Sequence, residues 1–145
     1  MRKFEKVSYS EEGILPTRGD VRSAGYDLYT PVKIIVGAHQ MIKVSTKIKA
    51  YMEPDEVLNI YPRSSIGIKK HLMLANSVGI IDSSYVDNAD NEGDIIVALY
   101  NYGDEEIVIE AGDRIAQGVF NKYLITDDDN TTNTERKGGI GSTGK

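Results

Sequence analysis

Cysteine is absent from the 145 residues, so disulfide bridges, thiolate metal ligands and a thiol nucleophile are excluded. Only two histidines occur, His39 and His71, and they lie far apart with no acid at ligand spacing. Neither a zinc site nor a Ser-His-Asp triad is therefore expected. The sequence also lacks an apolar run long enough for a signal peptide or a membrane span, which predicts a cytoplasmic protein.

Positive charge is also scarce, with 17 Lys and Arg against 22 Asp and Glu. The formal net charge of -5 argues against a general nucleic-acid-binding surface, which needs a basic face. A local pocket for a small anionic ligand remains compatible with this balance. Hydrophobic residues make up 40% of the chain, an ordinary fraction for one soluble domain with a real core.

Short segments with alternating apolar and polar residues dominate the sequence. The run at 42–50 reads as one strand with an apolar face, and the only helix candidate covers 65–74. Further strands are predicted at 56–61, at 94–109 as two strands joined by a turn, and at 113–125.

Many strands with almost no helix predict an all-β, jelly-roll-like barrel or sandwich. Apolar content falls sharply after about residue 126. We therefore expect one β-domain at 1–126 and a flexible C-terminal arm at 127–145.

Two segments in the first half combine polar side chains with turn-forming residues. In "SAGYDLYT", Asp27 interrupts a strand-like run, as either a solvated turn residue or a functional carboxylate. In "YPRSSIGIK", Arg63, Ser64 and Ser65 follow a proline at the start of the helix candidate. A helix start of this kind suits an oxyanion, and it equally suits a serine helix cap.

Two segments in the second half carry further candidates. In "ANSVGIIDSSYVD", Asp82 follows two apolar residues at a predicted strand end, where a base can be tuned by desolvation; a turn residue is the alternative. Tyr85 offers a flat face for a planar ligand. In "GDRIAQGVF", Arg114 and Gln117 interrupt an apolar strand, either as an edge-strand pair or as hydrogen-bonding groups for a ligand.

The last ten residues, "RKGGIGSTGK", hold four glycines, a Ser-Thr pair and three cations. Backbone N–H groups freed by glycine, beside a positive charge, suit an anion such as phosphate. Phosphate-binding loops usually lie between a strand and a helix, whereas this segment is terminal. A disordered end is the alternative.

Taken in order, "AGYDL", "PRSS", "GIIDSSY", "GDRIAQ" and "GGIGSTG" closely resemble the five motifs of the homotrimeric dUTP pyrophosphatases (dUTPases). The resemblance covers residues 24–144. It implies a jelly-roll-like β-fold and a homotrimer with three active sites shared between subunits. It also implies Mg²⁺-assisted hydrolysis of dUTP to dUMP and pyrophosphate, which limits uracil in DNA and supplies dUMP for thymidylate synthesis.

The resemblance further implies a role for each matched position. Asp82 matches the acid that activates the attacking water, Tyr85 the tyrosine under the deoxyribose, and Asp27 an acid that reaches Mg²⁺ through water. The other matched positions are expected to bind substrate: Asn76, Gly79 and Ile81 at uracil; Arg63, Ser64, Ser65 and Gln117 at the phosphates; and Arg136, Lys137, Ile140, Gly141, Ser142 and Thr143 in a tail that closes over the site.

This chain departs from the family pattern in three places. Only Lys137 separates Arg136 from the glycine pair, so either cation is a candidate for the γ-phosphate contact. Ile140 stands where the family has an aromatic residue over uracil. The segment "VDNADNE" at 86–92 lengthens a loop after Tyr85, a change that a β-scaffold tolerates at low entropic cost.

Two other functions share parts of this pattern. The dCTP deaminases have the same fold and a similar "RSS" segment, but their catalytic glutamate matches Ala98 here, which disfavours deamination. A module that binds dUTP and regulates a partner protein through the tail or the 86–92 loop would keep the same motifs.

Overall fold

The computed structural model describes residues 1–131 and 138–141, which form a mostly β protein with one short helix, as predicted. The elements are β1 (Lys3–Lys6), β2 (Thr17–Arg18), β3 (Tyr26–Tyr29), β4 (Ile34–Val36), β5 (Met41–Ser45), β6 (Ile48–Tyr51), β7 (Glu56–Tyr61), α1 (Ser64–Lys70), β8 (Leu72–Leu74), β9 (Gly79–Asp82), β10 (Ile96–Asn101), β11 (Ile107–Ile109) and β12 (Arg114–Lys122). None of the described residues forms a helix long and apolar enough to cross a membrane.

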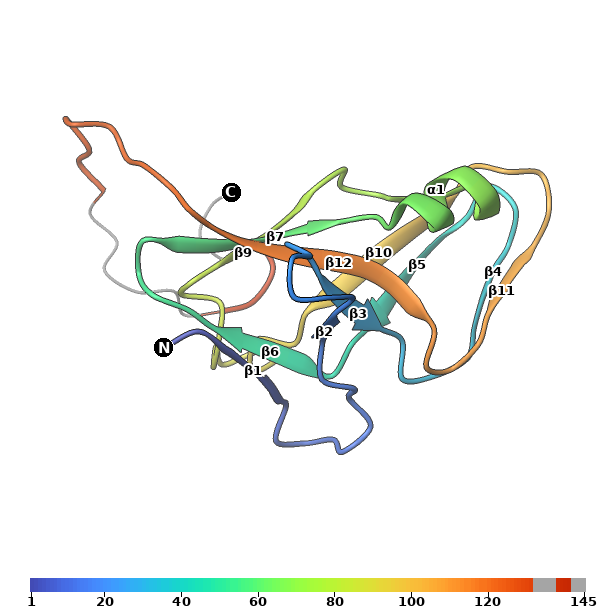
Figure 1. The fold of residues 1–145 in the computed structure, drawn as a ribbon, viewed down its shortest axis with the longest axis horizontal. Coiled ribbons are helices and arrows are strands. Elements are labelled where there is room, and N and C mark those ends of the chain that lie inside the picture. Colours follow the sequence, from blue (N-terminus) through green and yellow to red (C-terminus); the bar gives the residue numbers. More distant parts are fainter. Residues whose placement is uncertain (132–137, 142–145) are drawn as a thin grey trace.

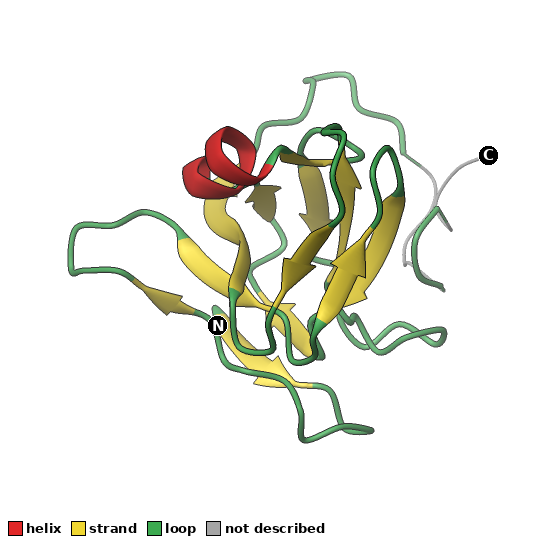
Figure 2. Ribbon diagram, turned by 90° about the vertical axis from the view of Figure 1, so that its right-hand side faces the viewer, coloured by secondary structure: helices red, strands yellow, loops and turns green. Residues whose placement is uncertain are grey.

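The strands pair antiparallel throughout the described residues (Figures 1 and 2). The largest sheet has the order β2-β3-β12-β7-β9, and a three-stranded sheet has the order β5-β10-β8. Two-stranded pairs, β1-β6 and β11-β4, complete the fold. Most of the strands contribute apolar side chains to one shared core, so the architecture is a single β-sandwich.

Alternation along the strands positions this core. In β7 every second residue is buried, and in β10 the same pattern recurs. Leu58, Leu99 and Ile115 are fully buried between the sheets. A residue that points inward on β7 is thus followed by one that points to the other face of its sheet.

The alternating run at 42–50 forms two strands, so the prediction of one strand is wrong. β5 ends at Ser45 and pairs with β10, whereas β6 begins at Ile48 and pairs with β1. Between them Lys47 has a φ of 59°, a left-handed conformation that its side chain does not predict. The expected inward face persists across the break, because Val44, Thr46 and Ile48 are all buried.

The helix predicted over 65–74 is also wrong in its extent. α1 covers Ser64–Lys70 and ends at His71, which has a φ of 55° and donates its backbone N–H to the Ile66 carbonyl. The residues after it alternate between exposed and buried and form β8.

The two strands predicted within 94–109 do not pair with each other. β10 pairs with β5 and β8, whereas β11 pairs with β4, so the turn in 94–109 joins two different sheets. The chain also changes sheets before Asp82, because β8 pairs with β10 and β9 pairs with β7. Local sequence predicts strands and turns here, but not the partner of each strand.

Candidate active site

Three polar side chains form a row across the five-stranded sheet. Gln117 on β12 is paired with Asp27 on β3 and with Tyr61 on β7. Because directly paired residues project from the same face of a sheet, the row brings three distant segments together. Gly25 makes room for it, since a Cβ at this position would lie 2.5 Å from Gln117 Oε1. Gln117 also donates from Nε2 to the Pro62 carbonyl oxygen at 3.3 Å, beside the start of α1.

Asp27 holds two guanidinium groups at this face. Its Oδ1 lies 3.1 Å from Arg63 Nε, and its Oδ2 lies 3.4 Å from Arg114 Nη1. The Asp27 side chain is only 12% exposed, so the two cations compensate a largely buried carboxylate. A guanidinium has five N–H donors, so donors of both arginines remain for a further anion.

The row opens into a cavity of about 470 Å³, named the arginine pocket after its two arginines, Arg63 and Arg114. Ser64, the first residue of α1, is exposed and also lines this pocket. The helix N-cap is Arg63, without a side-chain capping bond, so Ser64 does not serve as the cap. Ser65, which the motif resemblance also assigns to the phosphates, is not among the residues that line the pocket.

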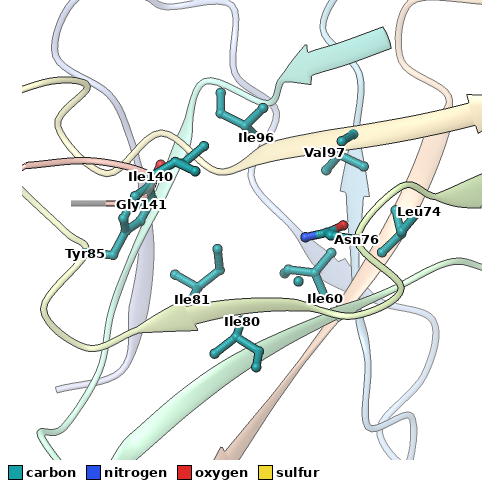
Figure 3. A pocket seen from close by; sticks show the side chains of 12 residues that line it. Ile60, Leu74, Asn76, Ile80, Ile81, Tyr85, Ile96, Val97, Ile140 and Gly141 are labelled. Carbon is teal, nitrogen blue, oxygen red and sulfur yellow. The ribbon is translucent and has the colours of Figure 1, made fainter. Parts of the chain in front are cut away.

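A second cavity, of about 170 Å³, lies where the chain crosses from β8 to β9 and is named the intersheet pocket (Figure 3). Asn76, Gly79, Ile81 and Tyr85 all line it. Figure 3 shows Ile81 pointing into the pocket and Asn76 at one side of it. An apolar cavity with few polar groups suits the flat, largely apolar face of a small ligand.

Tyr85 is fixed in the wall of this pocket. Its ring is buried, and its hydroxyl donates to the Asp94 carbonyl oxygen at 2.8 Å. The same hydroxyl accepts a hydrogen bond of 2.8 Å from Asn91 Nδ2. With both bonds in place, the ring has little freedom to turn away from a ligand.

Residues of the C-terminal tail lie against the same pocket. Ile140 and Gly141 line it, and Gly141 has a φ of 76°. Four further tail positions assigned from the motifs lie outside the described residues: Arg136, Lys137, Ser142 and Thr143.

Asp82 ends β9 and is separated from the intersheet pocket by the alternation of the strand. Ile81 is paired with the fully buried Leu58, whereas Asp82 is paired with Val57 and is exposed. Its carboxylate therefore projects from the outer face of the sheet and does not line the pocket formed by Ile81 and Tyr85.

The two pockets face different sides of the five-stranded sheet. Ile60 lines the intersheet pocket and its neighbour Tyr61 lines the arginine pocket, and successive strand residues point to opposite faces. In the described part of the chain, no residue lines both. One chain thus places Asn76, Gly79, Ile81 and Tyr85 in one pocket and Arg63, Ser64 and Gln117 in the other.

Several site residues carry no clear signal in the sequence. Ile60 lines the intersheet pocket and Tyr61 lines the arginine pocket. Both lie on β7, which is placed between β12 and β9, and the periodicity of the sequence does not specify these partner strands. Ser23 also lines the arginine pocket. It lies in the segment "SAGYDLYT", in which the sequence singles out Asp27 as the only candidate. Composition gives no hint that Asp90, in the 86–92 loop, contacts the tail.

An antiparallel β-sandwich with one cation-lined pocket and one pocket lined mainly by apolar side chains suits a small ligand with anionic and planar parts. The dUTPase family model matches residues 11–144. The chain is 46% identical to deoxyuridine 5'-triphosphate nucleotidohydrolase of Lactococcus lactis, covering 99% of this chain and 98% of the relative. It is 38% identical to the enzyme of that name from Haemophilus ducreyi, over 90% and 87% of the two chains.

Solved structures agree with these matches. The dUTPase of Streptococcus mutans superposes with a TM-score of 0.82 at 42% identity, covering 86% of this chain and 98% of that one. A dUTPase from phage phi11 of S. aureus, at 18% identity and a TM-score of 0.76, covers 93% of this chain and 98% of its own and shares the fold. This chain belongs to the dUTPase family.

Proposed function

We propose that this protein hydrolyses dUTP to dUMP and pyrophosphate. The observation that carries the proposal is the sorting of the family's motif residues into two chemically matched pockets. The arginine pocket offers two guanidinium groups, a serine hydroxyl and a glutamine amide, donors that suit a triphosphate. The intersheet pocket offers apolar walls with a single amide side chain, which suits a pyrimidine base.

Uracil is read in the intersheet pocket. β9 is the edge strand of its sheet, so one side of its backbone is not used in the β7 ladder. Those backbone groups and the Asn76 amide match the donor and acceptor edge of uracil. Cytosine has the opposite arrangement of donor and acceptor at N3 and C4. Binding it would leave buried polar groups unpaired, so the pocket should reject dCTP strongly.

The reaction is an attack of water on the α-phosphorus. Asp82 accepts a proton from the water, whose oxygen bonds to the α-phosphorus while the bond to the pyrophosphate oxygen breaks. The rigid Tyr85 ring packs under the deoxyribose and leaves no room for a 2′-hydroxyl. Arg63, Ser64 and Gln117 orient the phosphate chain, and Asp27 fixes the guanidinium of Arg63.

The residues present fit Mg²⁺ only as an outer-sphere ion. The described residues contain no cluster of three or more acidic or histidine ligands. Magnesium prefers phosphate oxygens and water to such a cage, and Asp27 keeps lone pairs that accept hydrogen bonds from metal-bound water. When bound to the triphosphate, the ion supplies charge neutralisation at the phosphates.

A complete site needs more than one copy of this chain. The two pockets open on opposite faces of one sheet, so a substrate that spans both chemistries would have to be bound between neighbouring subunits. A homotrimer, in which neighbouring chains contribute the intersheet pocket and the arginine pocket to one site, meets this need.

The deciding experiment is pyrophosphate release from dUTP compared with dCTP, dTTP and UTP, with ammonia release measured in parallel. We expect turnover of dUTP alone. Ala98 lines the intersheet pocket and no carboxylate lies among its described lining residues, so deamination of dCTP is not expected. Tight dUTP binding without turnover would instead favour a regulatory binding module.

A further inference from the structure

The loop after Tyr85 carries an acid that contacts the C-terminal tail. Asp90 Oδ2 accepts a hydrogen bond of 2.7 Å from the Gly139 backbone N–H, and Gly139 is buried. The two residues that follow, Ile140 and Gly141, line the intersheet pocket. We propose that Asp90 is a positioning residue that holds the glycine-rich tail over bound substrate, a role that rests on the proposed hydrolysis of dUTP.

Two ion pairs anchor the 86–92 loop to the sandwich. Lys49 on β6 lies with its Nζ 2.7 Å from Asp87 Oδ1 and 2.8 Å from Glu92 Oε1. The Lys49 side chain is 9% exposed, whereas the Asp87 and Glu92 side chains are 50% and 22% exposed, so the lysine end of both pairs lies in the protein and the carboxylate ends reach water. Asp87 also donates its backbone N–H to the Glu92 carbonyl oxygen at 2.9 Å, which closes the loop at its base.

Within the loop, Asn88 fixes the backbone of Asp90. Its Oδ1 accepts hydrogen bonds from the backbone N–H of Asp90 at 2.9 Å and of Asn91 at 3.1 Å. Its Nδ2 donates to the Tyr85 carbonyl oxygen at 2.8 Å. Gly93 completes the loop with a φ of 92°, where a Cβ would lie 2.7 Å from the Val86 Cα. Asp90 is therefore held in register with Tyr85, a wall of the pocket that the tail covers.

The contact joins a charged acceptor to a backbone donor. Such charge-assisted bonds are stronger than neutral ones, and this one acts at the residue directly before those that cover the pocket. A backbone donor makes the contact independent of the tail side chain at that position. It is equally independent of whether the tail comes from the same subunit or from a neighbour.

The test compares Asp90→Ala and Asp90→Asn with wild type, each with and without residues 136–145. In the full-length trimer we expect kcat/KM for dUTP to fall about tenfold or more for Asp90→Ala. Asp90→Asn should fall less, because its amide oxygen still accepts the Gly139 hydrogen bond. Glu106→Ala, an exposed acid outside both pockets, is the charge-matched control and should match wild type.

The truncated background separates positioning from a general structural role. If Asp90 acts only through the tail, Asp90→Ala should cause no further loss once residues 136–145 are removed. An equal loss in both backgrounds would overturn the proposal, and so would full activity of Asp90→Ala in the intact chain.

A second readout does not depend on turnover. Trypsin cleaves after Arg136 and Lys137, and the rate of tail loss can be followed by intact mass spectrometry with a non-hydrolysable α,β-imido dUTP present. We expect faster cleavage of Asp90→Ala than of wild type, and equal rates would contradict the role of Asp90. If the wild-type protein failed to hydrolyse dUTP, the proposed function would be wrong. The cleavage comparison would still show whether Asp90 holds the tail.

Discussion

Asp82 occupies a distinct position among the acids of the site, because it ends β9 on the face away from the intersheet pocket. We expect Asp82→Asn to preserve the fold and dUTP binding and to lower hydrolysis. Losing a general base costs about a hundredfold to ten-thousandfold in rate. Pyrophosphate release and the melting temperature, measured on the same preparation, check this. Near wild-type turnover would remove Asp82 from the role of base.

Tyr85 allows the ring and the hydroxyl to be tested separately. Tyr85→Phe keeps the ring but removes the bonds to Asp94 and Asn91, so it should lower the free energy of unfolding by about 1–3 kcal/mol. It should still reject UTP, since the ring remains under the sugar. Tyr85→Ala opens space there, and we expect the ratio of UTP to dUTP turnover to rise. Unchanged discrimination in Tyr85→Ala would assign the exclusion of ribose to another residue.

At this scale, sequence motifs single out candidate site residues but do not predict which side chains hold them. The resemblance singles out Asp27, and the structure places it between Arg63 and Arg114, which explains why it is largely buried. Neither pairing follows from spacing, because the three residues lie on different strands and a helix start. Asp90 is similar, since only folding reveals that Gly139 lies within hydrogen-bonding distance of it.

Ion pairs hold the 86–92 loop to the sandwich, so its stability should depend on pH. Lys49 lowers the pKa of Asp87 and of Glu92, in each case mainly by a side-chain hydrogen bond to the carboxylate. A folded-state pKa below the ordinary value stabilises the protein above about pH 4, and this contribution is lost as the pH falls through the lowered pKa.

Lys49→Met should therefore be less stable than wild type near neutral pH, where both carboxylates are charged. The difference should shrink below about pH 4, where the acids become protonated in both proteins. Urea unfolding across this pH range measures it. Lys43→Met, at an exposed lysine of β5, is the control and should parallel wild type at every pH. A constant gap between Lys49→Met and wild type would show that the ion pairs are not its cause.

At the scale of elements, alternation predicts strands, and long-range pairing decides the sheets. β7 matches the predicted segment 56–61 because a clean period of two spans it. The run at 42–50 looks equally regular, yet it divides at Lys47, where the chain turns from one partner strand to another. No local property of a lysine indicates a positive φ, so this break depends on tertiary structure.

For the whole molecule, the central feature is that one sheet separates the two pockets that we propose act together. The intersheet pocket and the arginine pocket use alternate residues of β7, so no rotation of side chains brings them together. Family resemblance predicts sharing between subunits, and sequence alone gives no geometric reason for it. The separation of the two pockets is a geometric argument for the proposed sharing, although Ile140 and Gly141 line the intersheet pocket of their own chain. Whether the working tail acts within one chain or between chains is open to a direct test.

Mixing two inactive variants distinguishes these arrangements. One variant is Asp82→Asn with an intact tail, and the other lacks residues 136–145 but keeps Asp82. Each should be a folded trimer, and the truncated one should melt near the wild-type temperature because the described residues of the removed segment add nothing to the apolar core. If the tail closes over a neighbouring subunit, mixed trimers contain sites with Asp82 from one chain and a tail from the other. Pyrophosphate release from dUTP should then rise above that of either variant, in step with subunit exchange followed by native mass spectrometry.

If the tail acts within its own chain, every site lacks either Asp82 or a tail, and verified exchange without recovery of activity would establish that arrangement instead.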